Sequence, residues 1–95
     1  MISEKQKARV EHLCRVMRDL SGIDPMNKSR KRDVVAARTI VAHTLITEGF
    51  SHTEIGELLG VDRSTVYYYE DRILGYRFGG YEPEWDLWNK FKKAI

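Results

Sequence analysis

Residues 62–68 concentrate side chains whose hydrogen-bonding chemistry suits base edges and phosphates. Arginine makes two parallel hydrogen bonds to guanine better than other side chains do, and serine or threonine can bond either base edges or phosphates. Tyrosine adds a hydroxyl for phosphates and a ring that can contact a thymine methyl group. The candidate contact residues in this stretch are Asp62, Arg63, Ser64, Thr65, Tyr67 and Tyr68. Such a set could both read and hold a nucleic acid.

The residues before this stretch predict a short helix followed by a tight turn. Ser51 and Glu54 form a capping box that begins the helix, and Gly60 can adopt the positive φ that ends it. Gly56 has no side chain, so a second helix can cross the first closely. Asp62 is a favourable N-cap for that second helix.

The second helix is predicted to have one buried and one exposed face. Val66, Tyr69 and Ile73 have the spacing of a buried stripe, which leaves the polar side chains of 62–68 facing outward. The pattern is that of a helix-turn-helix over about residues 51–74, a motif in which the start of the second helix enters the major groove. The first helix opens with Ser51, His52 and Thr53, where backbone N–H groups can bind a phosphate.

The net charge of +2 conceals three blocks of different sign. Residues 1–38 carry ten basic against five acidic residues, residues 39–71 one against six, and residues 72–95 five against three. The acidity of the middle block counts against duplex binding, because that binding depends on neutralising several phosphates. Arg63 is the one Lys or Arg of this block.

The missing positive charge lies in a basic segment, residues 28–38. We expect its cations to open a long helix over about residues 29–48. Cations at a helix N-terminus oppose the macrodipole, so the run indicates an outside anion rather than a stabilising role. The alternative is a solvated basic face. The candidate contacts here are Arg30, Lys31, Arg32 and Arg38.

Three motifs follow one another along the chain: SRKRDVVAAR at 29–38, EIG at 54–56 and DRSTV at 62–66. In this order they resemble the C-terminal DNA-binding domain of the bacterial replication initiator DnaA, over about residues 10–95. The resemblance implies a helical, Trp-repressor-like fold and sequence-specific binding of short double-stranded sites, in replication or transcription control.

The resemblance also implies residue roles. Arg32, or Arg30 in the alternative register, would reach into the minor groove beside the site. The positions that would read bases in the major groove are Asp62, Ser64 and Thr65. The chain departs from the family at Arg63, where the family has a histidine, and in a turn about one residue shorter. We therefore expect it to read a site different from the initiator's own.

Residues 1–95 are predicted to form one all-α domain, a small bundle of about five helices, because helical apolar spacing runs through most of the chain. The first helix is expected from a capping box at Ser3 and Gln6 to Gly22. Its apolar stripe is Val10, Leu13, Cys14, Met17 and Leu20. The glycines at 75, 79 and 80 predict a loop over residues 76–81.

A last, aromatic helix is predicted over about residues 83–95, with Pro83 in its first turn. Trp85, Trp88 and Phe91 are expected to pack under the bundle. The alternative is that some of them form a homodimer or protein-partner surface, since two tryptophans are many for so small a core.

Several function classes find no support in the sequence. The chain lacks a G-x-x-x-x-G-K-(S/T) phosphate loop, so we expect no ATPase activity, and no nucleophile–base pair predicts an enzyme. His12, His43, His52 and Cys14 do not have metal-ligand spacing, and no cofactor is expected. No apolar stretch is long enough to span a membrane, and we expect a cytoplasmic, nucleoid-associated protein. The competing hypothesis is a protein-interaction module that keeps the fold but does not bind DNA.

Overall fold

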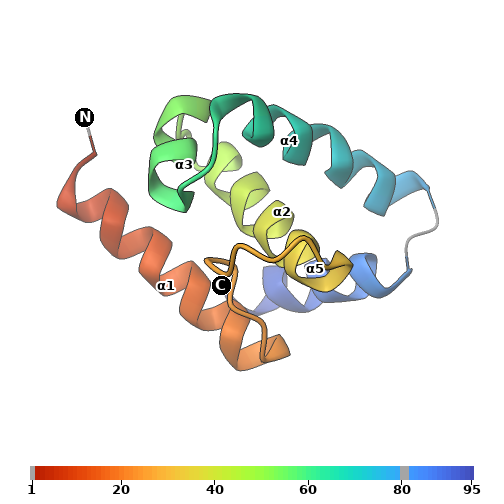
Figure 1. The fold of residues 1–95 in the computed structure, drawn as a ribbon. Coiled ribbons are helices and arrows are strands. Elements are labelled where there is room, and N and C mark those ends of the chain that lie inside the picture. Colours follow the sequence, from red (N-terminus) through yellow and green to blue (C-terminus); the bar gives the residue numbers. More distant parts are fainter. Residues whose placement is uncertain (1, 80–81) are drawn as a thin grey trace.

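The computed structural model describes residues 2–79 and 82–95, and these residues form five α-helices and no strand (Figure 1). The helices are α1 (Glu4–Ser21), α2 (Arg32–Thr47), α3 (His52–Leu59), α4 (Arg63–Phe78) and α5 (Glu82–Ala94). The predicted all-α bundle of five helices is confirmed. None of the described helices is long and apolar enough to cross a membrane.

Helix α2 is the centre of the bundle. Ten of its sixteen residues are buried, and each of the other four helices packs against it. Figure 1 shows α2 crossing between α1 on one side and α4 on the other. A helix covered on every side must be apolar around most of its circumference, which its run of Val, Ala, Ile and Leu provides.

Helix α1 begins and ends where the sequence predicts. Ser3 and Gln6 form the capping box, and Gly22 ends the helix with φ 72°. The predicted stripe is buried from Val10 to Met17, but Leu20 is 40% exposed, so its assignment to the core was wrong. Leu20 is the penultimate residue of α1, beyond the buried stretch that runs from Val10 to Met17.

Helix α2 begins three residues later than predicted, at Arg32. Two local side-chain bonds hold the preceding backbone out of the helix: Ser29 N–H donates to Asn27 Oδ1 at 2.9 Å, and Lys31 N–H donates to Ser29 Oγ at 3.2 Å. Arg30 and Lys31 therefore precede the first helical residue, with Lys31 as the N-cap. Only Arg32 of the basic run lies in the first turn.

Helix α4 runs through the first half of the loop predicted at 76–81 and ends at Phe78, followed by Gly79 as C-cap. Tyr76 extends the buried stripe of α4 and is almost fully buried. Burying such a side chain is worth about 1.5–3 kcal/mol, which exceeds the roughly 1 kcal/mol that Gly75 costs inside a helix. The remaining loop positions, 80 and 81, lie outside the described residues.

The aromatic helix α5 packs as predicted, with Trp88 and Phe91 buried in the core and Trp85 half-buried. The ring of His43 from α2 meets Trp88 edge-on, with 5.1 Å between centroids. Leu74 and Phe78 on the end of α4 are exposed. The alternative of a homodimer or partner surface at these aromatics stays a prediction.

Candidate nucleic-acid interface

The turn between α3 and α4 is built on two glycines. Gly60 ends α3 with φ 70°, and Val61 N–H donates to the Gly56 carbonyl at 2.9 Å. A Cβ on Gly56 would lie 2.8 Å from the Val61 carbonyl oxygen, closer than such atoms approach. Gly56 is thus required, and the closest approach is to the turn backbone, with the backbone nitrogen of Arg63, the first residue of α4, next at 3.5 Å.

The start of α3 is fixed by the predicted capping box. Glu54 N–H donates to Ser51 Oγ at 3.1 Å, and Ser51 N–H donates to Glu54 Oε1 at 2.9 Å. Gln6 of α1 donates to the other carboxylate oxygen at 2.7 Å. The bonds from Ser51 N–H and Gln6 hold the pKa of Glu54 below its ordinary value. Because Ser51 is used in the cap, the first-turn N–H groups of His52 and Thr53 are those left for a phosphate.

The outward face of α4 carries the predicted contact residues. Arg63 and Ser64 are exposed, Tyr67 and Tyr68 are 48% and 51% exposed, and Thr65 is half-buried. The stripe expected to face inward, Val66, Tyr69 and Ile73, is buried. Asp62 occupies the N-cap position, yet its side chain makes no capping bond, and its carbonyl accepts the N–H groups of Thr65 and Val66 instead.

The ring of Tyr67 packs against His52, the first residue of α3. The two rings stack with 4.0 Å between centroids and 6° between planes. His52 Nε2 also lies 3.3 Å from Glu70 Oε1. The imidazole of His52, a residue whose backbone N–H is the predicted phosphate donor, thus holds a tyrosine of α4 in place.

Tyr68 is held by Arg72, which the sequence analysis did not single out. Arg72 Nη1 donates to the Tyr68 hydroxyl at 2.9 Å, and its Nε donates to the Tyr76 hydroxyl at 3.0 Å. The three residues recur every fourth position along α4, so helical spacing was the signal that could have found the contact.

The basic segment supplies fewer outward cations than its sequence suggests. Lys28 Nζ donates to the carbonyls of Leu59 and Gly60, at 2.8 and 2.9 Å, and so caps the C-terminus of α3. Arg38 is only 5% exposed and donates to the carbonyls of Asn27 and Ser29. The prediction of Arg38 as a DNA contact is corrected, because its guanidinium is used inside the protein.

The side chain of Arg32 also binds another residue of the protein. It forms two hydrogen bonds with the carboxylate of Glu84 on α5, of which the Nη2–Oε2 bond measures 3.0 Å. Glu84 is 3% exposed, and the bond from Arg32 lowers its pKa. The guanidinium predicted to enter a minor groove is thus held by an acidic side chain 52 residues further along the chain.

Three predicted contacts keep cationic side chains turned outward. Arg30, Lys31 and Arg63 are exposed, and none of these side chains forms a hydrogen bond or ion pair with another described residue. The contact of Lys28 with the end of α3 fixes the segment that leads to Arg30 and Lys31 beside the turn.

The residues considered for metal binding lie apart. His12 is exposed, and Cys14 is buried in the core as predicted, where burial raises the pKa of its thiol to about 11. Among the residues with described positions, no three His, Cys, Asp or Glu side chains could hold a metal ion.

Comparison with known proteins assigns no family. No family model, curated protein or solved structure matches the chain. The resemblance to the DnaA domain therefore stays a prediction based on three motifs, and the candidate interface depends on its own geometry.

Proposed function

We propose that this protein binds double-stranded DNA sequence-specifically through the start of α4, and that it acts in replication or transcription control without ATPase activity. The observation that carries the proposal is the outward face of α4. Arg63, Ser64, Tyr67 and Tyr68 share it directly after a tight turn, while the opposite face is anchored in the core. Such a protein would work in the cytoplasm, at the nucleoid.

The residues of this face have distinct roles in the proposal. Arg63 donates two hydrogen bonds to a guanine, and Ser64 bonds a neighbouring base edge or phosphate. The stacking of His52 and the hydrogen bonds of Arg72 restrain Tyr67 and Tyr68 before any DNA arrives. Restrained side chains lose less conformational entropy on binding, which favours their use as contacts.

The phosphate contacts are assigned to Arg30, Lys31 and the N–H groups at the start of α3. The acidity of the middle block opposes them less than its charge suggests. Glu48 is paired with the guanidinium of Arg9 at 2.6 Å, which offsets one of the acidic charges of this block. Exposed charges separated by more than about 8 Å are also largely screened at physiological salt.

Site selection from a random duplex library, followed by titration at several salt concentrations, tests the proposal. We expect one selected sequence, and a log affinity that falls with log salt with a slope corresponding to about three to five phosphates. Failure to select a sequence, with weak binding to every duplex at low salt, would contradict it.

The alternative function, a protein-interaction module, is favoured by the exposed rings of Tyr67 and Tyr68, since tyrosine is enriched at protein interfaces. The same library selection separates the two functions, because a docking module would select no duplex.

A further inference from the structure

A groove lies between α1, the segment that follows it and α3, away from the outward face of α4. It encloses about 360 Å³. Its apolar lining is formed by Val10 and Cys14 of α1, Met26, and Leu58 of α3. The thiol of Cys14 stays protonated at neutral pH and acts as an apolar group, since burial raises its pKa to about 11. Met26 is 39% exposed, so a large apolar side chain faces solvent here.

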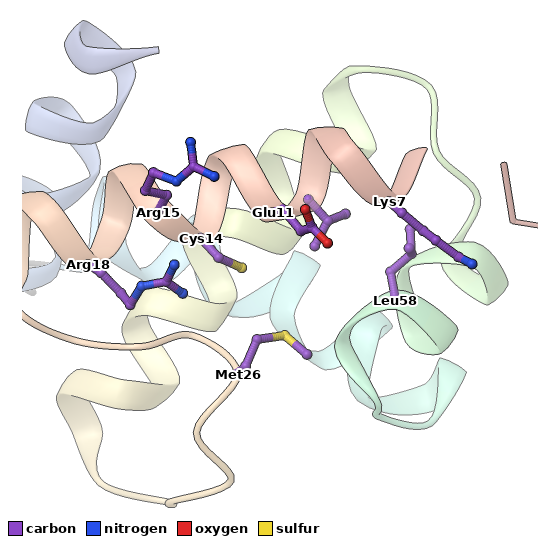
Figure 2. A pocket seen from close by; sticks show the side chains of 8 residues that line it. Lys7, Glu11, Cys14, Arg15, Arg18, Met26 and Leu58 are labelled. Carbon is purple, nitrogen blue, oxygen red and sulfur yellow. The ribbon is translucent and has the colours of Figure 1, made fainter. Parts of the chain in front are cut away.

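Cations border this apolar lining along α1. Lys7, Arg15 and Arg18 line the groove, against one acidic side chain, Glu11. Figure 2 shows Lys7 and Leu58 at one end and Arg18 at the other, with Glu11, Cys14 and Met26 between them.

The internal partners of these cations hold them weakly. Lys7 lies 3.5 Å from Glu4 and Arg18 lies 3.5 Å from Asp24, and all four side chains are about half or more exposed. Exposed pairs of this kind contribute little, typically up to about 1 kcal/mol. An outside anion can therefore replace Glu4 or Asp24 at small cost.

The spacing of the cations decides between kinds of ligand. Lys7 and Arg18 are eleven positions apart, which corresponds to about 16 Å along a helix. One carboxylate cannot reach both, whereas about five residues of extended peptide span that distance. Glu11, between the two ends, repels an anion at the centre of such a ligand.

Duplex DNA fits this groove less well. An apolar lining offers nothing to a phosphate backbone, which binds through charge and hydrogen bonds. None of the lining residues belongs to the set assigned to DNA.

We propose that this groove binds an acidic peptide segment of a partner protein, with apolar side chains at its centre on Met26 and Leu58 and carboxylates at its two ends on Lys7 and Arg18. The site is independent of the proposed DNA contacts, so the protein could hold a partner and a duplex together.

The test uses a fluorescein-labelled peptide, Glu-Glu-Leu-Ser-Leu-Glu-Glu, and the full chain. Fluorescence anisotropy should show binding that weakens with added salt, and the methyl NMR signals of Met26 and Leu58 should shift. Replacing the glutamates by glutamine, or the leucines by serine, should each weaken binding about tenfold or more. Equal binding of either control peptide would overturn the proposal.

A matched pair of double variants tests the location. Lys7→Gln with Arg18→Gln should weaken peptide binding about tenfold, because two rim charges are lost. Lys90→Gln with Lys93→Gln changes the net charge equally on α5, outside the groove, and should leave binding within about twofold. Circular dichroism checks that both variants are folded. If both double variants weaken peptide binding equally, the groove is not the peptide-binding site.

Other occupants are distinguishable by the same variants. If decanoate binds as tightly as the peptide, the ligand of the groove is a small monocarboxylate and not a peptide. Self-association that the groove variant abolishes would make the occupant a second copy of this chain. Loss of duplex affinity in the groove variant, without peptide binding in the unmodified protein, would make the groove a phosphate contact. Each of these results overturns the proposal, and the peptide, decanoate and self-association measurements need no duplex.

Discussion

The basic segment at 28–38 and the helix-turn-helix at 51–74 both contain predicted DNA contacts, but the fold uses their polar side chains differently. In the basic segment Lys28, Arg32 and Arg38 bind carbonyls or a carboxylate of the protein itself. In the helix-turn-helix, Arg63 and Ser64 stay exposed. A run of cations is therefore weak evidence for an outside anion until the groups opposite each cation are known.

The difference has a physical origin in sequence separation. The bonds of Lys28 and Arg32 join residues 31 and 52 positions away, which no local pattern indicates. The outward face of α4 follows from helical periodicity alone. The comparison can be tested in both regions.

The largest expected effect is in the turn. Gly56→Ala places a methyl group 2.8 Å from the Val61 carbonyl oxygen, and backbone rather than a flexible side chain would have to move. We expect a loss of about 2–4 kcal/mol in the free energy of unfolding, measured by urea denaturation. Glu57→Ala, at the next and exposed position, should change it by less than about 0.5 kcal/mol. Equal stability of the two variants would show that the turn is not as tight as described.

The second prediction distinguishes two arginines of the basic segment, one that we expect to stabilise the fold and one that we expect to contact DNA. Arg38→Met leaves the carbonyls of Asn27 and Ser29 without their donor, so we expect a loss of about 2–3 kcal/mol. Arg30→Met should leave stability unchanged but weaken duplex binding and reduce its salt dependence. Thermal denaturation and duplex titration measure the two properties. A reversed pattern would mean that Arg38, not Arg30, is the outward cation.

A smaller effect is expected at the ion pair of Arg32 and Glu84. The pKa of Glu84 is lowered by the bond from Arg32, so its contribution to stability is present above the ordinary glutamate pKa, near 4.3, and is lost as the pH falls through the lowered value. Glu84→Gln should cost about 1–2 kcal/mol at pH 7 and reduce this acid sensitivity.

The same variant tests whether Arg32 can serve DNA. Loss of the carboxylate charge weakens the hold on Arg32, which the DnaA resemblance places in a minor groove. We expect duplex affinity to rise severalfold in Glu84→Gln. If Glu84→Gln loses stability as expected but its duplex affinity is unchanged, Arg32 stabilises the fold and does not contact DNA.

Local signals in the sequence were enough to predict much of the fold. The capping boxes at Ser3 and Ser51 and the left-handed glycines at 22 and 60 depend on neighbours within a few residues, and the structure contains each of them. The late start of α2 was also within reach, since Asn27 and Ser29 bond the backbone two residues ahead.

Other features depend on packing between distant segments. Gly75 suggested the end of a helix, but the burial of Tyr76 against the bundle carries α4 onward to Phe78. In the candidate site, periodicity predicted which residues of α4 face outward, but not the stack of His52 on Tyr67, which needs the angle between α3 and α4.

The most direct test of duplex recognition compares two exposed arginines of α4, at its two ends. Duplex titration of Arg63→Ala against the selected site should show a loss of about 1–3 kcal/mol and relaxed preference at one base position. Arg77→Ala removes the same charge from the last turn of the helix and should cost clearly less, with base preference unchanged. If folded Arg63→Ala keeps both the affinity and the base preference of the unmodified protein, α4 does not read DNA.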